Sequence, residues 1–145
     1  MKMRASLEAV LFQPPTTTHP PLMDDTQTTI ADLRELVRKF VDERDWQQFH
    51  SPKNLAMALA IEAAELMEHF QWVDLGTSRE VTDDEEKLTA IGEELADVLS
   101  YTLALANSLG IDLATAHRRK MLMNADKYPA DKFRGKFGDK KSLAD

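Results

Sequence analysis

The chain lacks cysteine altogether, and its charge is predominantly of one sign. Its 145 residues include 25 acidic and 18 basic side chains, which leave a formal net charge of −7. Without cysteine there are no disulfides, no thiolate nucleophile and no cysteine-bound zinc, so a metal would need oxygen or histidine ligands. The acidic charge also argues against binding to nucleic acid, because nonspecific contact with a phosphate backbone needs a basic surface.

Long hydrophobic runs are absent as well. No apolar stretch approaches the roughly 20 residues that a membrane-spanning helix needs. The basic first residues are not followed by the unbroken apolar region of a secretory signal. We therefore expect a cytoplasmic protein without a membrane partner. Hydrophobic residues make up 43% of the chain and charged residues 30%, a composition typical of one globular domain.

The two ends of the chain differ from its middle in composition. Residues 1–25 contain a proline- and threonine-rich stretch without helical or strand period, and Leu7–Gln13 resembles an imperfect viral protease tag site. We expect a disordered or tag-like extension there, either vector sequence or native. Residues 131–145 form a basic tail, which leaves one expected domain over residues 26–130.

Between these ends the apolar residues recur at three- and four-residue steps, the period of an α-helix. No stretch alternates as a half-buried strand does, so we predict an all-α, four-helix bundle-like fold without a sheet. The predicted helices span about residues 29–45, 52–70, 82–109 and 112–127. Their expected start and stop signals are Thr28 or Thr29, Ser51-Pro52, the acidic run 82–86, Gly110, Asp112 and Tyr128-Pro129.

Two of these helices carry pairs of carboxylates inside or beside apolar runs. The pairs have the spacing E-x-x-E/D, and their members are Glu62, Glu65, Glu94 and Asp97. On a helical wheel Glu62 falls on a leucine stripe, and the second pair falls at the rim of an apolar arc. Glu86 and Glu93 point away from that arc to solvent. A buried carboxylate is costly unless it is protonated, paired with a base or bound to a metal.

Three interpretations of these acids follow from their setting. They are an ordinary acidic surface, they pair with a base from another helix such as Lys120 or Lys127, or they bind a cation. No lysine or arginine lies between Met57 and Gln71. Two pairs of oxygen ligands on facing helices suit Mg²⁺ or Mn²⁺ better than zinc. A magnesium site made wholly of these acids would carry excess negative charge. The coordination of the ion would be completed by waters and by the phosphates of a substrate.

Aromatic residues lie beside the acidic helices in the sequence. Trp46 and His50 stand at the junction of the first two helices, and Trp72 follows the second. Aromatic faces can enclose a nucleobase, although packing in the core or at an interface is the alternative. Tyr101 follows Asp97 by four positions, so it shares a helical stripe with that acid and can reach a ligand at the metal.

The fourth helix carries a polar stripe at positions i, i+4 and i+7, formed by Lys120, Asn124 and Lys127. Lysine can neutralise phosphate, and asparagine can hydrogen-bond a base or sugar. A solvated helix face is the alternative. His69 and His117 complete no ligand spacing, so we expect them to be ordinary histidines.

Four segments carry a further signal through their order and spacing: Glu43–Leu55, Glu62–Trp72, Glu93–Tyr101 and Lys120–Pro129. Together they resemble the all-α nucleoside triphosphate pyrophosphohydrolases of the MazG-like superfamily, and within it the dCTP pyrophosphatases. The resemblance covers about residues 30–130. It implies Mg²⁺-dependent hydrolysis of a nucleoside triphosphate, dCTP or a modified dCTP, to the monophosphate and pyrophosphate, with a role in cleaning the nucleotide pool.

The same resemblance implies roles for individual residues. The metal ligands and catalytic residues would be Glu62, Glu65, Glu94 and Asp97, with Glu65 as the expected general base. The substrate would contact Trp46, His50, Trp72, Tyr101, Lys120, Asn124, Lys127 and Tyr128. A homotetramer built from dimers is implied, in which aromatic residues of one chain complete a neighbour's pocket.

Two other classes of protein compete with this enzyme. One is a helical module that binds nucleotides or partner proteins without hydrolysis, although binding alone does not require four acids. The other is a di-iron carboxylate bundle. That site uses an E-x-x-H motif on two helices, and no such motif occurs in the chain.

Overall fold

The computed structural model describes residues 23–136, and within these residues it contains helices and turns but no strand. The helices are α1 (Ile30–Asp42), α2 (Pro52–Glu68), α3 (Glu85–Leu109), α4 (Leu113–Lys127) and α5 (Ala130–Phe133). Three 3-10 turns also occur, namely η1 (Trp46–Phe49), η2 (Thr77–Arg79) and η3 (Val81–Asp83). The all-α prediction is confirmed. Most of the expected N-terminal extension and the end of the basic tail lie outside the described residues.

Helices α1 to α4 begin at side-chain caps that are visible in the sequence. Thr29 caps α1 in a capping box with Asp32, and Ser51 caps α2 just before Pro52. Asp84 and Asp112 accept hydrogen bonds from backbone N–H groups in the first turns of α3 and α4. The first helix is shorter than predicted, since it ends at Asp42 and the chain then enters η1.

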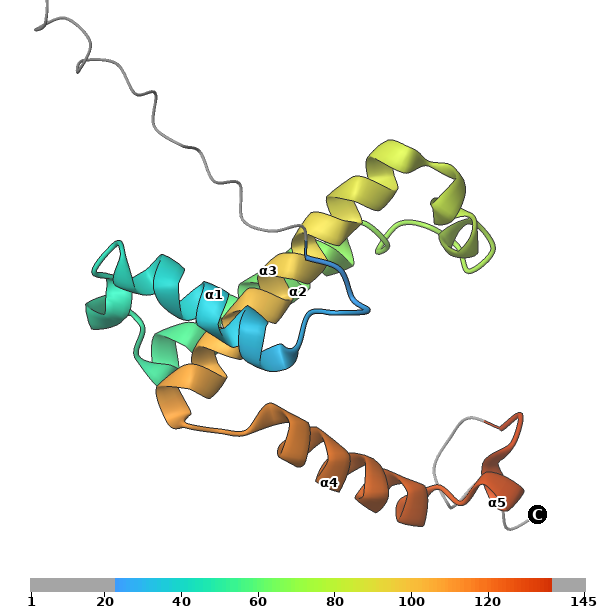
Figure 1. Cartoon of the computed structure of the whole chain (residues 1–145). Coiled ribbons are helices and arrows are strands. Elements are labelled where there is room, and N and C mark those ends of the chain that lie inside the picture. The colour runs from blue at the N-terminus through green and yellow to red at the C-terminus, as the bar shows by residue number, and fades with distance from the viewer. Residues whose placement is uncertain (1–22, 137–145) are drawn as a thin grey trace, which may run out of the picture.

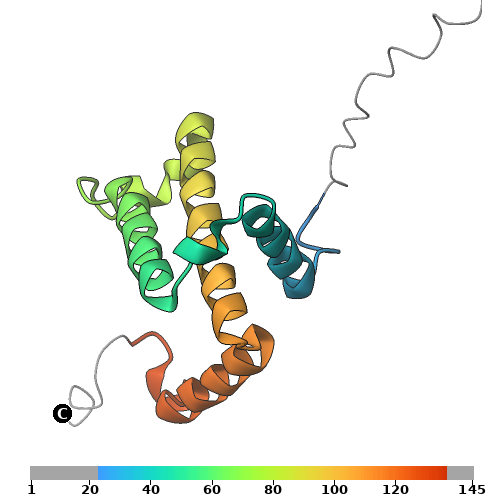
Figure 2. The same ribbon diagram turned by 90° about the vertical axis from the view of Figure 1, so that its left-hand side faces the viewer.

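The long helix α3 lies at the centre of the fold, with α2 on one side and α1 on the other (Figure 2). The buried side chains come from all three helices and are Val41, Leu55, Ile91, Leu103, Ala104 and Ala106. In both views α4 extends from the end of α3 and lies apart from α2 (Figures 1 and 2). No helix among the described residues combines the length and the apolar character needed to cross a membrane.

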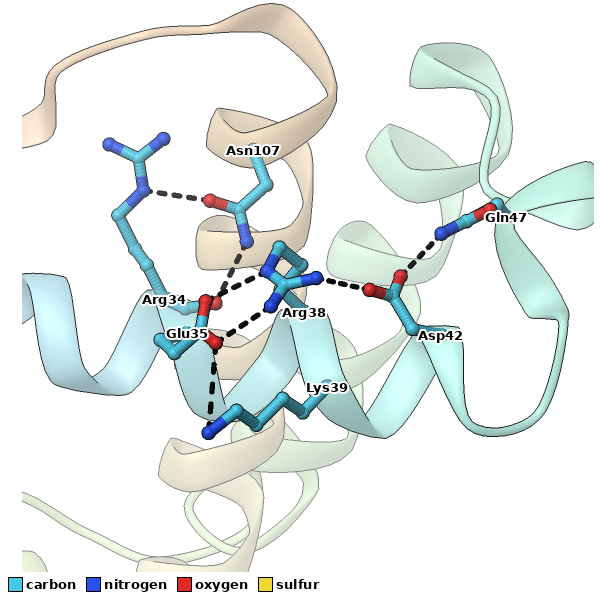
Figure 3. Close-up of polar contacts among 7 residues, drawn as sticks. All are labelled: Arg34, Glu35, Arg38, Lys39, Asp42, Gln47 and Asn107. Atoms are coloured by element: carbon cyan, nitrogen blue, oxygen red, sulfur yellow. Dashed lines mark hydrogen bonds and ion pairs between the residues drawn. The ribbon is translucent and has the colours of Figure 1, made fainter.

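A pair of polar side chains connects α1 to α3 although they are 73 residues apart in the sequence (Figure 3). Arg34 donates from Nε to Asn107 Oδ1 over 2.7 Å, and Asn107 Nδ2 donates to the carbonyl oxygen of Arg34 over 3.0 Å. Arg34 Nη1 also donates to the carbonyl oxygen of Ile111, directly before α4. These bonds hold α1 against the C-terminal part of α3.

Large apolar side chains are exposed on α1, α2, α3 and α4. On α3 they include Leu88, Leu95 and Leu99, whose seven- and four-residue steps place them on one face. The exposed residues on α2 include Met57 and Ile61, and α4 exposes Met121, Leu122 and Met123. Extended apolar surface of this kind is typical of faces that contact another protein.

Candidate active site

The packing of α2 on α3 brings the predicted acidic pairs together. Carboxylate oxygens of Glu62, Glu65 and Glu94 all lie within 4.8 Å of one another. Glu62 and Glu94 are half-buried and Glu65 is exposed, whereas Glu86 and Glu93 are exposed as expected. Asp97 lies close enough for its charge to raise the pKa of Glu62. The packing therefore brings three of the four predicted acids together, with Asp97 nearby, and their role as metal ligands stays a prediction.

The charges of this acidic cluster, Glu62, Glu65, Glu94 and Asp97, repel one another. Burial raises the pKa of Glu62, and the negative charges of Glu65, Asp97 and Glu94 raise it further. Glu94 Oε2 is buried and has no hydrogen-bond partner. An unpartnered buried carboxylate oxygen is unfavourable, because nothing replaces the water that it loses.

No basic side chain in the described part of the chain neutralises the acidic cluster. Where both partners lie within residues 23–136, the ion pairs join Arg38, Lys39 and Arg44 to acids on α1 or directly after it. The cluster combines three features that fit a divalent cation: hard oxygen donors, an excess of negative charge and an unpartnered buried oxygen.

A cavity of about 410 Å³ adjoins the acidic cluster on the α1 side of α3. Its lining residues come from α1, η1, the residue after η1, and α3, and they are Leu36, Val37, Phe40, Val41, Trp46, His50, Asp97, Ser100, Tyr101 and Ala104. Asp97 thus belongs both to the acidic cluster and to the cavity wall. A mostly apolar hollow of this size with a few polar groups suits a small organic ligand.

The aromatic residues of the cavity lie close to one another. The ring centroids of Phe40 and Trp46 are 5.8 Å apart in an edge-to-face arrangement, and those of Trp46 and His50 are 6.5 Å apart. The chain reaches this position through Asp45, the single described residue other than glycine with a positive φ, at 51°. This left-handed residue turns the backbone from the end of α1 into η1.

The remaining predicted substrate residues lie elsewhere in the protomer. Trp72, at 88% exposure, follows the end of α2. Three residues lie on α4 and one at its C-terminal cap, and these are Lys120, Asn124, Lys127 and Tyr128. Since α4 lies apart from the body of α1 to α3, one chain does not bring these residues to the cavity (Figure 1).

Sequence reasoning missed the apolar wall of the cavity. Val37 and Phe40 belong to the apolar period of α1, and that period predicts only that they face other helices. Phe40 remains 48% exposed, so it lines an open hollow instead of a filled core. Ser100 precedes the predicted Tyr101 and carried no signal of its own.

A sequence model of a protein family matches this chain and shows to which family it belongs. The model described as "MazG-like family" matches residues 57–139, more than half of the chain. The chain belongs to the MazG-like family. The resemblance seen in the sequence motifs is thereby confirmed, and the matched region contains all four residues of the acidic cluster.

Individual relatives agree with the family assignment. This MazG-like protein is 43% identical to "dCTP pyrophosphatase 1" of Homo sapiens over 104 residues, which are 72% of this chain and 61% of the human protein. It is 40% identical to the protein of the same name in Bos taurus over 121 residues, 83% of this chain and 71% of the bovine one. The chain thus spans less than two thirds of the human relative.

A solved structure agrees as well. The crystal structure of a pyrophosphatase from Archaeoglobus fulgidus matches with a TM-score of 0.65 and 38% sequence identity. The match covers 74% of this chain and 99% of the archaeal chain. The similarity therefore extends from the sequence to the arrangement of the helices.

Proposed function

We propose that this MazG-like protein hydrolyses a nucleoside triphosphate, dCTP or a modified dCTP, to the monophosphate and pyrophosphate. The observation that carries the proposal is the position of Asp97, which lies both in the acidic cluster and in the wall of the aromatic cavity. A nucleotide has the same two parts, a charged phosphate chain and an apolar base. The curated relatives named dCTP pyrophosphatase 1 support the reaction and the base.

The phosphate end of the site would hold Mg²⁺, for which Mn²⁺ could substitute, through the four acids of the cluster. When bound, the cation supplies positive charge to the phosphates of the substrate and to the leaving pyrophosphate. Glu65 is the proposed general base. Its exposure lets it reach a water molecule and accept a proton from it, whereas Glu62 and Glu94 are half-buried.

The base end of the site would be the aromatic cavity. Trp46 and Tyr101 offer ring faces, and His50 offers ring nitrogens that can hydrogen-bond polar edges of a base. A cavity of about 410 Å³ can hold one base together with part of its sugar. The phosphates would then extend past Asp97 towards the other acids.

The complete enzyme is proposed to be a homo-oligomer, a dimer or a tetramer. The exposed apolar faces of α2 and α3 support this, as does the position of α4 outside the body of the protomer. A neighbouring chain could bring Lys120, Asn124 and Lys127 to the phosphates or sugar, and Trp72 to the base. The cytoplasmic location and the role in cleaning the nucleotide pool stay predictions.

A panel of nucleoside triphosphates tests the proposed reaction. Purified protein with Mg²⁺ is incubated with each triphosphate, and pyrophosphate and orthophosphate are measured separately. We expect dCTP or its 5-modified forms to yield the monophosphate and pyrophosphate. Release of orthophosphate would contradict the proposed reaction. No turnover with any nucleotide would contradict it too, and would favour a module that only binds.

A further inference from the structure

Arg44 contacts the aromatic wall of the cavity without lining the cavity itself. Its guanidinium carbon is 3.7 Å from the centroid of the Phe40 ring and 6.0 Å from that of Trp46. Arg44 Nη1 also donates to the carbonyl oxygen of Phe40 over 3.0 Å. One side chain therefore contacts both the ring and the backbone of Phe40, and it lies near the ring of Trp46.

These contacts form a continuous stack that ends in the cavity. Arg44 covers the face of Phe40, Phe40 meets Trp46 edge to face, and Trp46 adjoins His50. A cation above an aromatic face is attracted by the negative charge of that face. Phe40 thus lies in contact with both Arg44 and Trp46.

The backbone around the stack is held by separate contacts. Asp45 adopts the left-handed conformation, which is unfavourable for a residue other than glycine and persists where neighbouring contacts hold it. On the other side of the turn, Gln47 donates to the carboxylate of Asp42, which also pairs with Arg38 (Figure 3). The side chain of Gln47 thus connects η1 to α1, and Arg44 contributes the contact to the rings.

We propose that Arg44 is a positioning residue that holds Trp46 in place as a preformed wall of the cavity. A preordered ring loses less conformational freedom when a ligand stacks on it, so binding of the ligand is tighter. The effect on a substrate rests on the proposed function, whereas the effect on the ring does not. The other partner of Arg44 is Glu43, 3.5 Å away in an exposed ion pair, and such pairs contribute little.

Tryptophan fluorescence tests the effect on the ring without any substrate. The chain has two tryptophans, so Trp72→Phe leaves Trp46 as the single emitter. In that background we expect Arg44→Met to raise the acrylamide quenching constant of Trp46 by about twofold, because the ring moves more freely. Arg44→Lys keeps a cation near the ring, so its quenching constant should lie between those of Arg44→Met and the protein that retains Arg44. Arg79→Met, at an exposed arginine on η2, is the matched control and should change nothing.

Steady-state kinetics then tests the effect on the substrate, in chains that retain Trp72. Arg44→Met should raise KM for dCTP about two- to fivefold, with kcat within a factor of about two. KM for deoxyribose 5-triphosphate, which has no base to stack on Trp46, should not change. Circular dichroism confirms that each variant is folded, and partial recovery of KM in Arg44→Lys separates the missing cation from a general loss of structure.

The outcomes separate this inference from the proposed function. An unchanged quenching constant in Arg44→Met overturns the inference, whether or not the protein hydrolyses nucleotides. An active enzyme whose KM for dCTP does not change, or changes equally for the substrate without a base, overturns it too. If the wild-type protein hydrolyses no nucleotide, the proposed function fails, and the quenching constant still decides whether Arg44 orders Trp46.

Discussion

Carboxylates on α1 and carboxylates between α2 and α3 experience opposite environments. Hydrogen bonds from Arg38 are the main cause of a lowered pKa for Glu35, and Asp42 also pairs with Arg38 (Figure 3). Burial and neighbouring negative charges instead raise the pKa of Glu62. Arg38 thus stabilises the ionised form of Glu35. Ionised Glu62 is instead unfavourable in its position, and a bound cation would remove that cost.

This difference separates acids that serve the fold from acids that we assign to function. The pairs of Arg38 lie on one helix at i, i+3 and i, i+4 steps, where exposed ion pairs contribute modestly to helix stability. Glu62 and Glu94 come from two different helices, and their carboxylate oxygens lie within 4.8 Å of one another. A cluster of like charges without a basic partner is unfavourable for folding, and such clusters are typical of binding and catalytic sites.

Substitution of an acid in the cluster and of an acid on α1 should differ most in their effect on catalysis. We expect Glu62→Gln to lower kcat/KM for dCTP at least about 100-fold, because the side chain keeps its shape but loses the charge proposed to bind the cation. The helices should stay folded, since the substitution also removes a repulsion. Pyrophosphate release and circular dichroism measure the two effects.

Glu35→Gln is the matched control for that substitution. It makes the same chemical change on α1, where the acid pairs with Arg38 and lies outside the cavity. Its kcat/KM should stay within about twofold of the wild-type value. Equal losses of activity in Glu35→Gln and Glu62→Gln would show that the comparison does not separate fold from function.

A smaller effect is expected in the pH dependence of stability without metal. The folded-state pKa of Glu62 is raised, so its contribution to stability is complete below the unfolded value, about 4.3, and is lost as pH rises through the folded value. The contribution of Glu35 to stability depends on pH in the opposite direction. Its pKa is lowered, so its contribution is present above the unfolded value and is lost as pH falls through the folded value.

Urea unfolding in the presence of a chelator, over a pH series from about 4 to 7, measures both signs. Relative to the wild-type protein, Glu62→Gln should become more stable as pH rises, and Glu35→Gln should become less stable. If the stability difference between Glu62→Gln and the wild-type protein stays constant with pH, the ionised form of Glu62 is not destabilised in the folded protein.

Much of this architecture could be predicted from local sequence signals. Ser51-Pro52 and Asp112 mark helix starts because capping involves only neighbouring residues, and Gly110 ends α3 in the left-handed conformation with φ at 63°. The acidic cluster was also predictable. Each E-x-x-E/D pair occupies one side of its helix, and consecutive helices tend to pack together.

Features that depend on distant contacts could not be predicted. The periodicity of α1 does not reveal that the helix ends at Asp42, since the left-handed Asp45 is held by contacts within the folded turn. Helical wheels likewise do not show where α4 lies relative to the other helices. For this reason the polar stripe of Lys120, Asn124 and Lys127 was predicted as a set, while its distance from the cavity was not.

Cation binding tests the central claim most directly, because it needs neither a substrate nor a chosen nucleobase. Binding of Mn²⁺ is followed by electron paramagnetic resonance for the wild-type protein, Glu35→Gln and Glu62→Gln, with Mg²⁺ as competitor. We expect wild-type protein and Glu35→Gln to bind Mn²⁺ equally, and Glu62→Gln at least about tenfold more weakly. Equal affinity in all three proteins, or no binding to the wild-type protein, would contradict the assignment of the acidic cluster as a metal site.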